Sequence, residues 1–106
     1  MKILGKKIEF NLTDVDNMEK MKNALEKVFK LSNENKETDE IKQLRFLCKT
    51  IRDCFTEVFG NDDLLPKEND YIVLIKAFED LSYAYKNKNE TGIKKLNSTL
   101  SKYGIK

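Results

Sequence analysis

The sequence contains no histidine and no tryptophan, only one proline, and just two arginines among its 20 basic residues. Without histidine, the chain lacks the commonest general base and the commonest metal ligand. With so few arginines, it has little capacity for bidentate recognition of phosphate, carboxylate or guanine, which lysine makes poorly. These absences argue against most classes of enzyme and against a dedicated DNA-binding protein.

Cysteine is also scarce, since Cys48 and Cys54 are the only two and lie six residues apart in one predicted helix. Six residues correspond to about 9 Å of helical rise, which exceeds the Cα separation that a disulfide tolerates. The CxxC pairs and Cys/His clusters of zinc sites are absent as well. We therefore expect both thiols to fill space in the core, and we expect no metal, no cofactor and no catalytic residue.

Long apolar runs are missing: no segment approaches the about 18 uncharged apolar residues of a membrane span. The opening residues 1–7 lack the apolar stretch of a signal peptide. The net charge is only +2, with 20 basic and 18 acidic residues, which argues against disorder and against nucleic-acid binding. These features predict a cytoplasmic protein with neither a membrane nor a nucleic acid as partner.

The first twelve residues have the alternation of a β-hairpin. Ile8, Phe10 and Leu12 alternate with polar residues, which is the period of a strand. Gly5-Lys6 suits a two-residue type II′ turn, so the pattern predicts that residues 2–4 pair with residues 7–11. Because an isolated hairpin is marginally stable in water, its apolar face must pack on the rest of the chain.

The rest of the chain has apolar residues spaced by three and four, which is the period of amphipathic helices. Phe55 is central to the longest stripe, which runs from Ile41 to Val58 and ends at Gly60. The sequence predicts one mainly α domain over 1–106, a compact bundle of about four helices (13–104) with a short N-terminal β-hairpin (1–12). The expected helices are 14–32 capped by Thr13, 38–59 capped by Thr38 or Asp39, 69–87 begun by Asn69 or Asp70, and 89–103 stopped by Gly104.

The acidic segment Asn61-Asp62-Asp63 with Glu68 invites a calcium-loop interpretation. However, Gly60 precedes the acids and Pro66 interrupts the segment, whereas an EF-hand loop needs glycine at its sixth position. A solvated connection between two helices explains these residues better.

Charge is distributed unevenly, with a net −5 over residues 54–85 and +5 over residues 86–106. One interpretation is a basic patch for an acidic partner or RNA. The alternatives are that the basic tail folds against the acidic third helix, or that it is simply solvated. The patch comprises Lys86, Lys88, Lys94 and Lys95.

Three large apolar residues lie off the stripes that their own helices need for the core: Phe46, Ile72 and Tyr83. Ile72 and Tyr83 are eleven residues apart, about three turns, and therefore share a line on one helix. Exposed apolar clusters usually mark an interface, although neighbouring elements can also cover such residues. If the second and third helices pack antiparallel through the loop 61–68, the three side chains form one shared partner-binding surface.

Two segments carry a resemblance to a known family. The opening residues 1–14 with Asn17-Met18-Glu19-Lys20, and the later Ile51-Arg52-Asp53-Cys54-Phe55-Thr56-Glu57-Val58-Phe59-Gly60, resemble small tail-region proteins of phages and prophages of Gram-positive bacteria. Those proteins are similar to tail assembly chaperones, helical proteins thought to coat the tape-measure protein until the tail tube polymerises around it. The resemblance, over residues 1–60, implies a viral, non-enzymatic protein in the bacterial host cytoplasm, with a tape-measure-like helical client and no defined active-site residue.

The alternative is a small phage-encoded inhibitor of a host defence protein, of the anti-CRISPR kind, which acts by occupying its target's surface. A small transcriptional regulator ranks lowest, because its recognition helix should be rich in Arg, Asn or Gln. The homo-oligomeric state stays open. Neighbouring genes for a major tail protein and a long tape-measure protein favour the chaperone, whereas small early genes favour the inhibitor.

Overall fold

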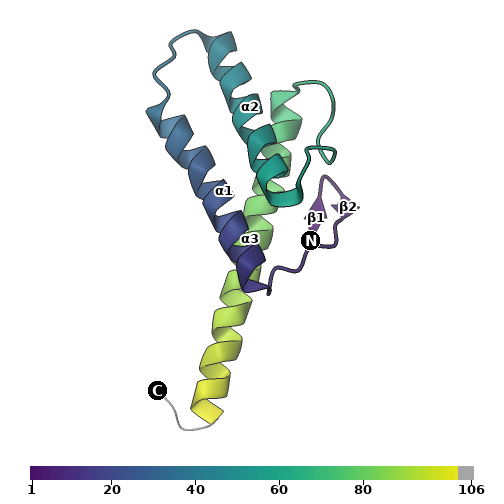
Figure 1. Cartoon of the computed structure of the whole chain (residues 1–106), viewed down its shortest axis with the longest axis vertical. Coiled ribbons are helices and arrows are strands. Elements are labelled where there is room, and N and C mark those ends of the chain that lie inside the picture. Colours follow the sequence, from purple (N-terminus) through teal and green to yellow (C-terminus); the bar gives the residue numbers. More distant parts are fainter. Residues whose placement is uncertain (103–106) are drawn as a thin grey trace.

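A computed structural model of the chain describes the backbone of residues 1–102 and the side chains of residues 1–88 and of Lys94. This part of the chain is mainly helical, with a short N-terminal hairpin, as the sequence predicts (Figure 1). The elements are β1 (Lys2–Ile3), β2 (Lys6–Lys7), α1 (Val15–Glu34), α2 (Glu40–Phe59) and α3 (Tyr71–Lys102).

The predicted number of helices is wrong, because α3 is continuous where a third and a fourth helix were expected. Asn89 and Thr91 can cap a new helix, and Gly92 disfavours an existing one. However, glycine costs a helix only about 1 kcal/mol relative to alanine, against about 3 kcal/mol for proline, and residues 87–92 contain no proline. The helix therefore continues, and its later half extends past the N-terminal end of α1 (Figure 1). The predicted stop at Gly104 lies outside the described residues.

The hairpin is present, but its turn is displaced by one residue from the prediction. Ile3 pairs with Lys6 and Lys2 with Lys7, so the turn residues are Leu4 and Gly5 rather than Gly5 and Lys6. Both have positive φ, 51° and 80°, as a type I′ turn requires. Since a slip of one residue reverses the faces of a strand, this register decides that Ile3 is buried.

The segment after β2 covers the end of the helical bundle, as expected for its apolar face. Leu12 is buried, and Ile8 and Phe10 pack partly buried against the core. The ring centroid of Phe10 lies 5.3 Å from that of Phe59 at the end of α2, in an edge-to-face arrangement. The regular strand pairing itself ends at Lys7, short of the predicted residue 11.

Side-chain caps begin the helices. Asp14 caps α1, since its Oδ1 accepts hydrogen bonds from the backbone N–H groups of Asp16 (2.9 Å) and Asn17 (3.3 Å). The predicted cap Thr13 is wrong, because its hydroxyl donates to Asn11 Oδ1 instead. The two predicted ends of α2 are confirmed: Asp39 accepts from the Lys42 N–H, and Gly60 has the left-handed φ of 86°. Asp70 Oδ1 accepts from the N–H groups of Ile72 and Val73, the first turn of α3.

The connection between α2 and α3 folds back along α2, so these two helices run in the same direction and α1 runs opposite to both (Figure 1). The start of α3 lies beside the middle of α2, where the Cys48 thiol contacts the carbonyl of Asn69 at 3.9 Å. The antiparallel packing considered from the sequence is therefore not formed. The connecting segment, residues 60–70 with one proline, is long enough to return along the helix that precedes it.

The predicted stripes supply most of the core, and both cysteines are buried and free within it. Phe29 and Ile41, which also belong to the stripes, are instead 58% and 60% exposed. Ile41 is uncovered because α3 begins only at the level of Cys48, which leaves the first turns of α2 without that neighbour. The buried apolar residues are Ile3, Leu12, Met21, Ala24, Leu25, Val28, Cys48, Ile51, Cys54, Phe55, Val58, Leu65, Leu74, Ala77 and Leu81.

Candidate functional site

The predicted partner-binding residues are placed on two helices. Ile72 and Tyr83 are 64% and 71% exposed on α3, whose opposite face buries Leu74 and Leu81 completely. Phe46 is half-buried on α2, two residues before Cys48 and therefore level with the start of α3. Tyr83 lies about 16 Å farther along α3 than Ile72, at 1.5 Å per residue. The three residues thus do not gather at one point, because Ile72 and Tyr83 are three turns apart on α3 and Phe46 is level only with the start of that helix.

The predicted basic patch lies on the extended part of α3. Lys86, Lys88 and Lys94 are exposed, and the side chain of Lys95 lies outside the described residues. Because residues 86–102 continue the same helix, the basic segment does not fold back against the acidic first half of α3.

A groove between the N-terminal hairpin and α3 brings together two predicted site residues, Tyr83 and Lys88. We call it the hairpin–α3 groove. Its cavity volume is about 370 Å³, within the range of about 300–1,000 Å³ typical of ligand pockets. Its lining residues are Met1, Lys2, Leu12, Asp80, Tyr83, Ala84, Asn87 and Lys88.

Asp80, which lines this groove, ties α3 to the hairpin turn. Its Oδ2 accepts the backbone N–H of Leu4 at 3.0 Å, and its Oδ1 accepts Lys76 Nζ at 2.8 Å. Burial raises the pKa of the Asp80 carboxyl, but the hydrogen bond from Lys76, the Leu4 N–H and the Lys76 charge lower it by more. The net pKa lies below its ordinary value of 3.8. The strained turn residue Leu4 is therefore held by a contact 76 residues away in the sequence.

This contact predicts a defined response to acid. Because the native pKa of Asp80 is depressed, its stabilising contribution is complete above pH 3.8 and is lost as the pH falls through the native value. We expect the amide resonance of Leu4 to titrate with a midpoint below pH 3.8 in an NMR titration, and to lose this titration in Asp80→Asn. A Leu4 amide that titrates identically in the two proteins would contradict the assignment.

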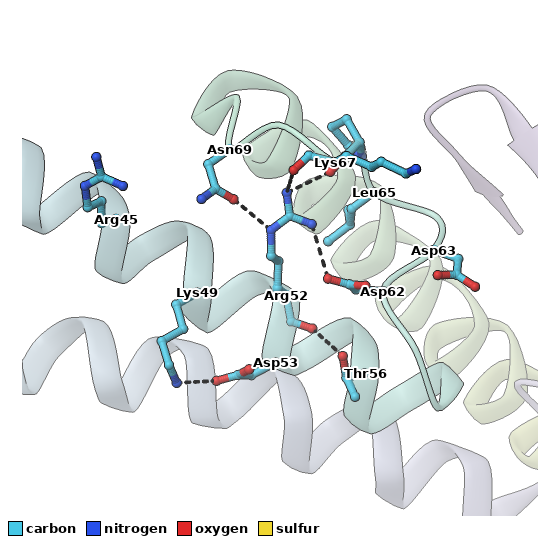
Figure 2. A pocket seen from close by; sticks show the side chains of 11 residues that line it. Arg45, Lys49, Arg52, Asp53, Thr56, Asp62, Asp63, Leu65, Lys67 and Asn69 are labelled. Atoms are coloured by element: carbon cyan, nitrogen blue, oxygen red, sulfur yellow. Dashed lines mark hydrogen bonds and ion pairs between the residues drawn. The ribbon is translucent and has the colours of Figure 1, made fainter.

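A second, more polar groove lies between α2 and the returning loop, and Arg52 organises it (Figure 2). Arg52 Nε donates to Asn69 Oδ1 at 2.8 Å, and Nη1 donates to Asp62 Oδ2 at 3.2 Å. Its Nη2 group donates to the carbonyls of Pro66 (2.7 Å) and Glu68 (2.9 Å), and at 3.3 Å to that of Lys67. The guanidinium therefore holds the returning loop on α2 by contacts to both of its ends.

The rest of this groove carries charges of both signs. Lys49 pairs with Asp53 at 3.0 Å, while Arg45, Lys67 and Asp63 also line the cavity of about 660 Å³ (Figure 2). Across the described part of the chain, no group of three or more His, Cys, Asp or Glu side chains is placed to hold a metal ion. We interpret this groove as structural. The sequence offers only a weak signal for it, an arginine in a chain of lysines, ten residues before an aspartate in a loop.

The surroundings of Cys54 make its thiol unreactive. Burial and the negative charge of Glu57 raise the pKa of its thiol to about 12, although the positive charge of Lys27 acts in the opposite direction. A thiol with so high a pKa has almost no thiolate at neutral pH, and the thiolate is the nucleophile and metal ligand. Cys54 therefore serves as a small apolar core residue, as the sequence predicts.

Fold and surface together define a small, mainly helical protein whose surface features are apolar side chains and grooves. The chain belongs to the DUF6673 family, a family of unknown function whose model matches residues 4–105. No curated protein and no solved structure matches the chain. Within the described residues, no helix combines the length and apolar character needed to cross a membrane.

Proposed function

We propose that this protein is a non-enzymatic phage or prophage protein that binds a protein partner, acting as a tail assembly chaperone for an apolar, tape-measure-like helical client. The observation that carries the proposal is the exposure of Ile72 and Tyr83 on α3, opposite a face that is fully buried. Exposed apolar patches usually mark an interface, and Ile72 and Tyr83 share one side of α3 because eleven residues are about three helical turns. The resemblance of residues 1–60 to phage tail-region proteins supplies the kind of partner.

The physical demands on such a chaperone fit this surface. The chaperone must cover an apolar helix of its client in water. It must later release that helix when the tail tube takes the chaperone's place. Anchors separated by about three turns along one helix contact a long client at several points, each of moderate strength. Separate moderate contacts can be broken one after another, which suits release.

Alanine substitution of the two exposed anchors tests the proposal. We expect Ile72→Ala and Tyr83→Ala to change the free energy of unfolding by less than about 1 kcal/mol, because both side chains are mostly exposed. Binding to the tape-measure protein of the same genome should weaken, by roughly 30-fold where an anchor contributes about 2 kcal/mol. The measurements are thermal unfolding and co-purification of the two co-expressed proteins.

The matched control is Ile41→Ala, since Ile41 on α2 is as exposed as Ile72, at 60% against 64%. Ile41→Ala should leave the affinity unchanged. Equal affinities for the Ile72, Tyr83 and Ile41 variants would show that exposed apolar residues of α3 are not the binding surface. Stable binding to a host defence enzyme instead of the tape-measure protein would favour the inhibitor over the chaperone.

A further inference from the structure

The hairpin–α3 groove has an apolar floor and an aromatic side. Leu12, only 5% exposed, lies at its base, and Tyr83 stands largely exposed at its edge. The side chain of Ala84 is small, and the hollow of about 370 Å³ opens beside it. A groove with these walls accepts an apolar side chain, because filling it removes apolar surface from water on both partners.

The rim of this groove is positively charged on both sides. Lys2 lines it from the hairpin and Lys88 from α3, and both are exposed. The one carboxylate in the lining, Asp80, already accepts the Leu4 N–H and pairs with Lys76. The exposed residues Lys6 and Lys7 add two more positive charges on the adjacent strand. The groove is therefore complementary to an apolar group that is flanked by negative charge.

The construction of the groove also favours a helical ligand over an extended one. Most of its lining comes from α3, whose backbone N–H and C=O groups are used within the helix. An added strand needs unpaired backbone groups along an edge, whereas an amphipathic helix is recognised through side chains alone. On such a helix, residues four apart lie on one face, so acidic residues can flank an apolar anchor by one turn on each side.

We propose that the hairpin–α3 groove binds an amphipathic helix of the partner, with an apolar anchor residue in the hollow beside Ala84 and with carboxylates one turn away paired to Lys2 and Lys88. This inference rests on the proposed function and names the chemistry of its client. It assigns the basic residue Lys88 to the same contact as Tyr83, and it leaves Ile72 outside the groove.

Three designed peptides of about 20 residues, long enough to hold a helix, serve as probes. The first has a leucine stripe flanked by glutamates, the second replaces the glutamates with lysines, and the third replaces the leucines with serines. Fluorescence anisotropy measures their affinities for the whole protein. We expect the first peptide to bind at least about 10-fold more tightly than the other two at low salt. Its affinity should fall as added salt screens the charges.

Charge reversal of the rim is the decisive variant. We expect the double variant Lys2→Glu, Lys88→Glu to bind the acidic peptide about 10-fold more weakly and the basic peptide more tightly. The control, Lys30→Glu with Lys36→Glu, makes the same change in net charge at exposed positions away from the groove and should leave both affinities unchanged. Ala84→Phe, which fills the hollow, should weaken binding of the acidic peptide. In the unaltered protein, the NMR shift changes caused by this peptide should centre on Leu12, Tyr83 and Ala84.

Several outcomes would overturn the inference. One is an equal effect of the two charge-reversed pairs on peptide affinity, and another is tighter binding of the serine peptide than of the leucine peptide. The others are an RNA oligonucleotide that displaces the acidic peptide, and self-association of the protein that depends on Lys88. Ile72 separates this failure from failure of the proposed function. If Ile72→Ala still weakens binding to the tape-measure protein while reversal of the rim charges does not, only the groove inference fails. If neither change weakens this binding, the chaperone proposal fails as well.

Discussion

Replacing Phe55 with alanine is expected to lower the free energy of unfolding by about 3–5 kcal/mol. The side chain is 0% exposed on the buried face of α2, and its ring centroid is 5.8 Å from that of Phe59. Its removal deletes buried apolar surface and leaves a cavity that three packed helices cannot close without moving. Equilibrium unfolding in urea, with the unchanged m-value that two-state behaviour requires, measures the loss.

Phe29→Ala is the matched control for this substitution. Phe29 is 58% exposed and makes one edge-to-face contact, with its ring centroid 5.7 Å from that of Phe78. We expect it to cost only about 1 kcal/mol, the value of such an aromatic pair. A loss below about 1 kcal/mol for Phe55→Ala itself would contradict its placement at the centre of the core.

The second large effect is expected at Arg52, where alanine should lower the free energy of unfolding by about 2–4 kcal/mol. The substitution leaves Asp62 without its ion pair and leaves the carbonyls of Pro66 and Glu68 without their donor. Arg52→Lys should recover less than half of the loss, because a single ammonium group cannot span acceptors that a guanidinium fork reaches together. The loosened loop should also expose the peptide bond after Lys67 to faster tryptic cleavage.

Arg45 provides the control, since it is the other arginine of the chain, lies on the same helix and is exposed. Arg45→Ala should change stability by less than about 0.5 kcal/mol and leave cleavage after Lys67 unchanged. Equal stabilities for the Arg45 and Arg52 variants would mean that the returning loop is held by its apolar contacts, such as buried Leu65, rather than by Arg52.

The candidate site was predictable only in part. Exposure of Ile72 and Tyr83 follows from helical periodicity, because each lies on the side of α3 away from its own core stripe. The hairpin–α3 groove was not predictable, because Lys2 and Lys88 are 86 positions apart and their approach depends on where the hairpin packs. The role of Arg52 was not predictable for a different reason: three of its acceptors are backbone carbonyls, which any residue supplies.

Local signals in the sequence determined the helices themselves and most of their ends. Asp39 and Gly60 begin and end α2 because capping depends on side chains and backbone angles within one turn, and the buried face of α2 follows from the spacing of its apolar residues. The tertiary structure alone decided the register of the hairpin turn and the common direction of α2 and α3. Local signals do not distinguish the alternatives in either case, so contacts between distant residues, such as Asp80 with Leu4 and Arg52 with the returning loop, select the outcome.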